Sequence, residues 1–424
     1  MRLLDLIIGA SPRTPGYARA TGVIAPDQGQ EMRIWVDVPE EMAADLSDNG
    51  NPWLAAMLPM AAAAHEDIQL SLPVDALLLE NLRGVSRIWA GWYPELDVVG
   101  LDAVGLDCAS CAAAAPPPPD RTAAFFSGGI DSYYTIARRL PGNDAGLPVV
   151  GRVDELLSVW GFDVSVNDQA GFAPMAQLLE SAAEQIQRSH AIIHTNLRDN
   201  RTVWQRRWGP LTNGAGLSFV ALMLEKRYRQ VFLGSSYPNY TGVPWGSHPL
   251  VDPLFSTSAM QIVHDGASST RVAKTDLVAR FLPAQSALHV CQAMAESNCS
   301  ECEKCYRTMI TIDILGHRQA MAQVFDWSRY DVAAIKNLSI GGVRDGIFYD
   351  EIIAAARAAG RHDVLRGLLR ARARSRLLYP ALQISDWLMK MPFLWRAGSA
   401  LKKIMQHGTI RQDYIEHPNA PSEH

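Results

Sequence analysis

Between residues 121 and 316, short apolar segments alternate with longer segments that have helical periodicity. The apolar segments lack the polar alternation of half-exposed strands, so both faces of the sheet that they form should be covered. This alternation predicts a doubly wound α/β fold, with a parallel sheet and helices on both sides. The predicted strands are residues 122–126, 155–162, 191–196 and 230–236, and the predicted helices are residues 131–140, 173–187 and 214–228.

Four consecutive prolines, in the run AAAAPPPPD, interrupt the chain before this region. Such a run favours an extended polyproline segment, which acts as a semi-rigid spacer. In the part before the run, residues 3–9 and 32–38 predict strands, and residues 52–64 and 76–92 predict helices. We predict four parts: an N-terminal α+β domain at 1–111, a linker at 112–120, the α/β domain at 121–320 and a helical, basic C-terminal region at 321–424.

The composition, with 48% apolar and 20% charged residues, is that of a soluble globular protein. A balance of 39 Lys and Arg against 44 Asp and Glu does not indicate a nucleic-acid-binding protein by bulk charge. The first residues are interrupted by Asp5 and are too short for a secretory signal. No apolar run reaches the roughly 18 residues of a membrane span. We therefore expect a cytoplasmic protein without a membrane span.

A glycine-rich turn, SGGIDS, separates the first predicted strand of the α/β domain from its helix. Gly128 and Gly129 lack Cβ and let the backbone approach an anion, and the helix start offers unpaired N–H groups. Ser127 and Ser132 add hydroxyl donors. Asp131 would repel a phosphate unless a cation lay between them, so it is the candidate Mg²⁺ ligand. The alternative is a plain turn in which Asp131 caps the helix.

The SGGIDS sequence resembles the signature of the PP-loop ATP pyrophosphatases, and it lacks the Lys of the common NTPase loop. In that superfamily the loop holds the pyrophosphate part of ATP while a substrate oxygen attacks the α-phosphate. The resemblance implies a HUP-like Rossmann-type core and an adenylating enzyme that uses ATP and Mg²⁺ and releases pyrophosphate.

Four of the six cysteines crowd into fifteen positions with the spacing C-x7-C-x2-C-x2-C. Four thiolates this close can surround one ion, and they satisfy tetrahedral Zn²⁺ with no open position, which predicts a structural zinc. An iron–sulfur cluster and free thiols are the competing interpretations. The four are Cys291, Cys299, Cys302 and Cys305. Cys108 and Cys111 also form a CxxC, but no second pair lies nearby, which favours two free thiols.

The glycine-rich turn followed by this cysteine spacing resembles the 7-cyano-7-deazaguanine synthase family of queuosine biosynthesis, over roughly residues 122–309. The resemblance implies a zinc site and a 7-deazaguanine-like carboxylate as substrate. It implies that Lys274, with Arg271 one helical turn away, neutralises the phosphates; a surface Lys/Arg pair is the alternative. The remaining residues that it places at the nucleotide are Trp160, Gly161, Gly234 and Ser235.

Several features depart from that family: the first 110 residues, the basic C-terminal region, and the segments TNLRD and WGSHPLVDP. They are similar to the enlarged synthase-like proteins of Qat and type IV CBASS anti-phage operons, some of which join a deazapurine to a protein amine. Asn196 and Arg198 are candidates to contact a carboxylate or ribose. His248, or His264 with its neighbour Asp265, is a candidate base, with a hydrogen-bonded loop histidine as the alternative.

The C-terminal region is basic: residues 357–411 contain twelve Lys and Arg against two acids. Arg366, Arg370 and Arg374 form an i, i+4 stripe. Such a surface would suit an acidic protein, RNA, an anionic membrane surface, the acidic remainder of the chain or a second copy. The alternative is a helix face that is simply solvated. We favour an acceptor or operon partner protein, because an acyl-adenylate needs its acceptor close by.

Taken together, the sequence predicts an ATP-dependent carbon–nitrogen ligase whose acyl acceptor is ammonia or a protein amine. One alternative is a tRNA-modifying PP-loop sulfurtransferase, for which only Cys108 and Cys111 are left as reactive cysteines. The other is a non-catalytic nucleotide-binding subunit, against which the intact SGGIDS turn argues.

Overall fold

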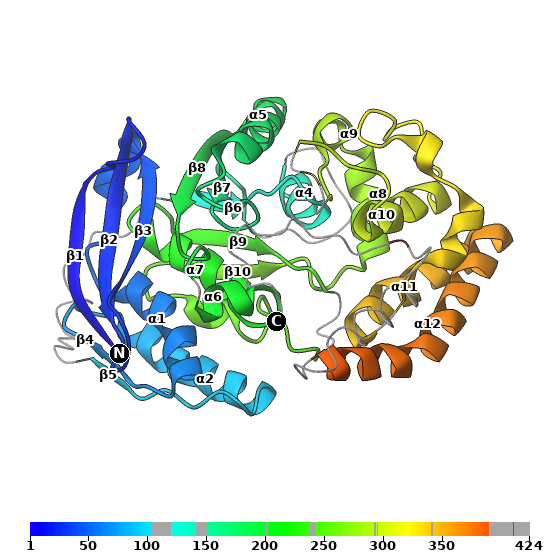
Figure 1. Ribbon diagram of the computed structural model, residues 1–424. Helices are drawn as coiled ribbons and strands as arrows, with labels where there is room; N and C mark the ends of the chain where they lie inside the picture. Colours follow the sequence, from blue (N-terminus) through cyan, green and yellow to red (C-terminus); the bar gives the residue numbers. More distant parts are fainter. Residues whose placement is uncertain are drawn as a thin grey trace. The chain divides into compact units, whose positions relative to one another are not determined.

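The computed structural model in Figure 1 divides into two compact units. The first contains Met1–Ser127 and Asp131–Ser268, and the second contains Gly128–Ile130 and Ser269–Glu416. The predicted linker and the pair Cys108 and Cys111 lie outside the described residues, so the four-part division stays a prediction. The structure describes residues 1–103, 120–140, 151–200, 202–237, 242–291, 294, 296–340, 342–389 and 410.

The first unit contains five parallel strands in the order β10-β9-β6-β7-β8. Taken in chain order, this is the 3-2-1-4-5 arrangement of doubly wound α/β sheets. The α/β prediction is therefore confirmed at the level of a mixed, largely parallel sheet with helices. The strands are β6 (Thr122–Phe125), β7 (Glu155–Trp160), β8 (Ser189–Thr195), β9 (Gln230–Gly234) and β10 (Gln261–Asp265).

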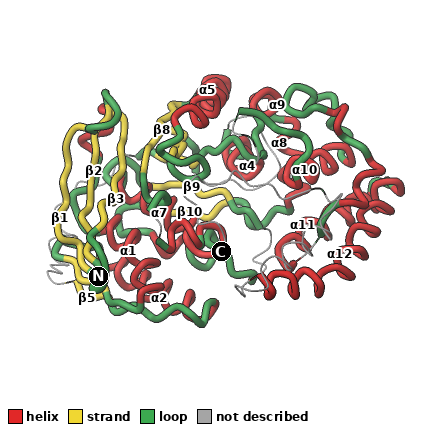
Figure 2. The backbone as a smooth tube through the Cα atoms, in the orientation of Figure 1, coloured by secondary structure: helices red, strands yellow, loops and turns green. Residues whose placement is uncertain are grey.

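Helices cover both faces of these strands, as their apolar composition requires. Figures 1 and 2 show α4 and α5 on one side of the sheet and α6 and α7 on the other. All four residues of β6 are buried, and so is almost every side chain of α7. The helices are α4 (Ile130–Ala137), α5 (Gln169–Ile186), α6 (Val203–Arg206) and α7 (Asn213–Met223), with short turns η2 (Trp208–Thr212) and η3 (Asp252–Phe255).

The strands of the N-terminal segment extend the same sheet. β3 pairs antiparallel with β8, with Val36 opposite Thr195, and β2, β1, β4 and β5 follow in that order, which makes ten strands. Trp53 is fully buried, and its ring occupies the space beside Gly22. The elements are β1 (Arg2–Ala10), β2 (Tyr17–Ala25), β3 (Met32–Pro39), η1 (Glu40–Asp45), α1 (Asn51–Ala64), β4 (Ile68–Leu70), α2 (Ala76–Trp92) and β5 (Leu101–Ala103).

Two histidines of β8 make the stability of the first unit depend on pH. Burial lowers the pKa of His190 and of His194 from 6.5 to about 4. The unfolded chain therefore binds more protons between these values, and the free energy of unfolding should fall as pH drops from 6.5 to 4, by on the order of 3 kcal/mol per histidine. Denaturant unfolding across this window measures the slope.

In His190→Gln the amide can still donate to the Ser158 hydroxyl, which His190 Nε2 contacts at 2.8 Å. We expect the free energy of unfolding of this variant to depend on pH about half as steeply as that of the wild-type protein. The exposed residue His362 provides the control, because His362→Gln should leave the slope unchanged. Equal slopes in all three proteins would contradict the assignment.

The second unit is mainly helical in its described parts. The long α12 packs on η5, where Gly367 lies against Ile335. Arg361 pairs with Asp313 at 2.8 Å, and Val364 is fully buried. The helices are α8 (Arg271–Arg280), α9 (Leu282–Ala287), α10 (Glu303–Ile314), η4 (Trp327–Arg329), η5 (Val332–Asn337), α11 (Gly342–Ala358) and α12 (His362–Met389). None of the described helices combines the length and the apolar composition that a membrane crossing requires.

Candidate nucleotide site and metal centre

The glycine-rich turn lies at the point where the strand order of the parallel sheet reverses. β6 has β7 on one side and β9 on the other, and the turn follows β6 directly. In open α/β sheets, ligands bind outside the carboxyl ends of the strands at such a switch point. Gly128 has φ +73°, a conformation that favours glycine. Ser127 N donates to Ser132 Oγ at 3.4 Å, and Asp131 lies in the first turn of α4.

The end of β9 lies directly against this first helical turn. A Cβ built on Gly234 would be 2.9 Å from the carbonyl oxygen of Asp131. The next residue, Ser235, donates its backbone N–H to Asp265 O at 2.7 Å, which links the ends of β9 and β10. The structure therefore places Gly234 against the backbone of Asp131. The contact of Gly234 and Ser235 with nucleotide, which the family resemblance implies, stays a prediction.

We expect Gly234→Ala to displace the first turn of α4 and to weaken nucleotide binding by about tenfold, because the new methyl group is too close to the Asp131 backbone. Binding of a fluorescent ATP analogue measures the loss. Gly9→Ala is the matched control, since nothing lies within 4 Å of a Cβ at that position. Wild-type affinity in Gly234→Ala would contradict the placement of nucleotide at this edge.

Trp160 and Gly161 lie at the carboxyl end of β7. Gly161 has φ +113°, and a Cβ there would be 1.8 Å from the carbonyl oxygen of Thr195, so the backbone requires glycine. The Trp160 ring stacks on Phe172 with 4.9 Å between centroids, and its Nε1 donates to Ser165 O at 2.8 Å. These contacts explain structurally why a tryptophan and a glycine occupy these positions. The contact of both residues with nucleotide stays a prediction.

Asn196 and Arg198 tie the end of β8 to other segments of the first unit. The Asn196 amide accepts from Trp35 N at 2.9 Å and donates to Arg33 O at 2.8 Å, which continues the pairing with β3. The Arg198 guanidinium donates to Phe162 O, and burial lowers its pKa. Contact of Asn196 and Arg198 with a carboxylate or ribose stays a prediction.

The predicted pairing of His264 with Asp265 is wrong. These residues belong to β10, where neighbouring side chains point to opposite faces of the sheet. Asp265 pairs with Arg139 at 2.5 Å. The imidazole of His264 instead contacts Asp252 on η3, with 2.8 Å between Nδ1 and Oδ2. Asp252 was not singled out in the sequence, because only the folded chain shows that it reaches His264.

Lys274 and Arg271 both lie on α8, in the second unit. Lys274 is only 1% exposed, so the alternative of a surface pair does not hold for it. Burial raises the pKa of Glu351, while the Arg271 N–H, which donates to it at 2.6 Å, and the Lys274 charge act in the opposite direction. A buried ammonium needs such compensation. The role of Lys274 and Arg271 at phosphates stays a prediction.

The four clustered cysteines form a group that could hold a metal such as zinc. Their Sγ atoms all lie within 4.8 Å of one another, and the pairs Cys291–Cys302 and Cys299–Cys305 are each 3.9 Å apart. Four sulfurs at 2.3 Å from a tetrahedral ion lie about 3.8 Å apart, so the spacing fits zinc. Contact with Cys291 raises the pKa of the Cys302 thiol to about 12, so metal binding at neutral pH must release protons.

Asn298 holds the segment that leads into Cys291. Its Oδ1 accepts from Val290 N at 2.8 Å and from Cys291 N at 3.1 Å, and its Nδ2 donates to Leu288 O at 2.7 Å. Between Leu288 and Val290, His289 N donates to the carbonyl oxygen of Gly128 at 2.9 Å. The segment that carries the first cysteine therefore also holds the backbone of the glycine-rich turn.

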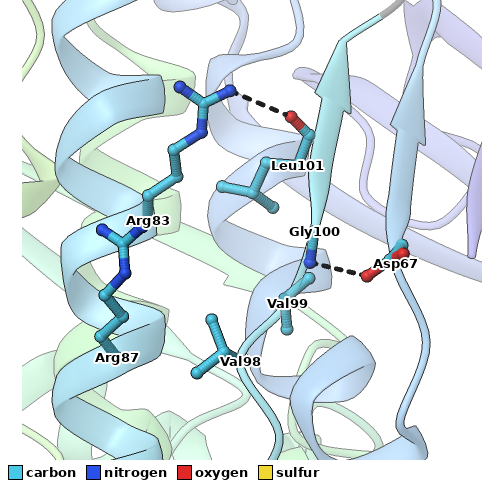
Figure 3. Close-up of a pocket in the computed structure, with 7 residues that line it drawn as sticks. All are labelled: Asp67, Arg83, Arg87, Val98, Val99, Gly100 and Leu101. Carbon is cyan, nitrogen blue, oxygen red and sulfur yellow. Dashed lines mark hydrogen bonds between the residues drawn. The ribbon is translucent and has the colours of Figure 1, made fainter.

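A cavity of about 490 Å³ lies in the N-terminal segment, between α2 and the stretch that leads into β5 (Figure 3). Arg83 donates to Leu101 O at 3.4 Å, and Asp67 accepts from Gly100 N at 2.6 Å. Arg87 also lines it, but the lining contains none of the residues that the sequence singled out. We assign no chemistry to this cavity.

No protein-family model, no curated protein and no solved structure matches the chain. Evidence for function therefore comes from the geometry of the site itself.

Proposed function

We propose that the protein is an ATP-dependent carbon–nitrogen ligase of the PP-loop type. It adenylates a carboxylate, by preference a 7-deazaguanine derivative, releases pyrophosphate and passes the acyl group to ammonia or to a protein amine. The observation that carries the proposal is the position of SGGIDS: a glycine-rich turn at the switch point of a parallel sheet, followed directly by α4.

The first step joins a carboxylate oxygen to the α-phosphorus of ATP and breaks the bond from that phosphorus to the pyrophosphate oxygen. The turn would hold the departing pyrophosphate with backbone N–H groups of the α4 start and with the hydroxyls of Ser127 and Ser132, which lie 3.5 Å apart. Mg²⁺, held by Asp131, would neutralise the phosphate charge.

The lack of a lysine in the turn supports adenylation over γ-phosphoryl transfer. The common NTPase loop uses its lysine at the β- and γ-phosphates. Here backbone groups, hydroxyls and one carboxylate are the groups available in the turn. Such a set suits a bound pyrophosphate that leaves as a unit, with the cation supplying the positive charge.

The test is to separate the products formed from ATP in the presence of candidate carboxylates. A 7-deazapurine carboxylate, a purine carboxylate and benzoate would each be incubated with ATP and Mg²⁺. The proposal expects AMP and pyrophosphate, dependent on one carboxylate. ADP and phosphate would contradict it. AMP formation only with added tRNA would favour the sulfurtransferase, and nucleotide binding without turnover would favour a non-catalytic subunit.

A further inference from the structure

A buried group of polar side chains surrounds Asp252, on the face of the sheet opposite Asp265. The carboxylate of Asp252 is fully buried and accepts three hydrogen bonds. Its Oδ2 accepts from Ser247 Oγ at 2.6 Å and from His264 Nδ1 at 2.8 Å. Its Oδ1 accepts from His248 N at 3.1 Å. Three donors suit an ionised carboxylate, which only accepts.

These contacts decide which nitrogen of His264 carries the proton. Because Nδ1 donates to Asp252, the neutral ring has its lone pair at Nε2. That nitrogen is buried and has no hydrogen-bond partner among the described residues. His248 has the opposite tautomer, since its Nδ1 accepts from Leu250 N at 3.1 Å, and its buried Nε2 likewise has no described partner.

A buried acceptor without a donor costs about 1–3 kcal/mol, so its presence in the folded protein needs a reason. The place of His264 suggests one. It is the penultimate residue of β10 and lies opposite Leu233 in β9, next to Gly234, whose Cα faces the backbone of Asp131. His264 is thus at the carboxyl edge of the sheet, two strands from the glycine-rich turn.

We propose that His264, oriented by Asp252, is the general base of the acyl-transfer step, an inference that rests on the proposed function. The amine nitrogen attacks the acyl carbon, the bond from that carbon to the AMP phosphate oxygen breaks, and AMP leaves with the bonding pair. One proton passes from the amine nitrogen to His264 Nε2. The imidazolium formed in this way is stabilised by the carboxylate at Nδ1 and later returns its proton to water.

The decisive variant is His264→Asn. Its side-chain amide can occupy the Nδ1 position and keep the hydrogen bond to Asp252, but it has no atom at Nε2. Transfer to ammonia should fall by about 100-fold or more. Pyrophosphate exchange into ATP should be unchanged, and so should trapping of the acyl group by hydroxylamine, a nucleophile strong enough to react without a general base. Exogenous imidazole should restore part of the ammonia reaction in His264→Ala.

The matched control is His190→Gln, which changes a half-buried histidine at the amino end of β8 and should leave all three reactions unchanged at pH 7.5. Wild-type ammonia transfer in His264→Asn would overturn the inference, and so would an equal loss of exchange and transfer. If His264→Asn does not fold by circular dichroism, Ser247→Ala should slow ammonia transfer alone, and no slowing would overturn it. A wild-type protein without pyrophosphate exchange would refute the proposed function itself.

Discussion

Asp131→Asn should reduce carboxylate-dependent pyrophosphate formation by about 100-fold or more and leave the fold intact. Asparagine has the size of aspartate but lacks the charge that, in the proposed function, holds Mg²⁺. The cost to the fold should be small, since a negative charge in the first turn of a helix contributes only about 0.3–1 kcal/mol. Initial rates and thermal unfolding of both proteins measure the two effects separately.

Asp168→Asn is the matched control for this substitution. Asp168 caps α5, another helix of the first unit, by accepting from Gly171 N at 2.9 Å. Asparagine caps as well as aspartate, so this variant should keep both rate and stability. Near-normal turnover in Asp131→Asn would remove the metal role. A rate that recovers when Mn²⁺ replaces Mg²⁺ would instead support it, because rescue by a different cation shows that the side chain acts through that cation.

Local patterns predicted most elements of this fold. The helical spacing of Leu79, Leu82, Val85 and Trp89 predicted α2, whose structure has the predicted bounds, and all four of these side chains are buried. The four strands predicted for the α/β region are also present, because each is a continuous apolar run between turn residues. The spacing of the cysteines is equally local, since three of them lie within seven residues.

Contacts between distant residues were beyond such patterns. No sequence pattern predicted β2, β4, β5 or β10. β10 reads QIVHD, with only two apolar residues, and its pairing with β9 is what identifies it as a strand. Nor does any local signal predict that β3 pairs with β8, about 160 residues away, or that Asn196 completes this pairing.

The same limit explains the error at His264. Adjacency in the sequence suggested Asp265 as its partner, but a strand sends consecutive side chains to opposite faces. The true partner, Asp252, lies twelve residues earlier, on η3. The pairing of a histidine on a strand with an aspartate on a neighbouring turn can be recognised only after the strand has been placed in the sheet.

Cys302→Ser should release the metal and destabilise the second unit strongly. Structural zinc contributes on the order of 10 kcal/mol to folding in small metal-bound peptides, and loss of one of four thiolates removes much of this. Cys302 also precedes α10, most of which is buried. We expect about one zinc per chain in the wild-type protein, little in the variant, and a fall in melting temperature of ten degrees or more, on the order expected for several kcal/mol.

The loss should extend to nucleotide binding, for a reason that the structure makes specific. His289 lies two residues before Cys291, and its N–H donates to the carbonyl oxygen of Gly128 at 2.9 Å. Metal release frees Cys291 and the segment that holds this hydrogen bond. A chelator added to the wild-type protein should therefore weaken binding of an ATP analogue before the protein as a whole unfolds, and added zinc should reverse the effect.

Cys108→Ser is the control, because Cys108 lies outside the four-cysteine group and should change neither metal content nor melting temperature. Iron with sulfide in place of zinc would overturn the zinc assignment, as would stable protein without metal. If the chelator leaves nucleotide affinity unchanged while zinc is removed, the hydrogen bond from His289 does not hold the turn in its binding conformation. In that case the cysteine group stabilises the second unit alone, and Asp131 and its neighbours act without its support.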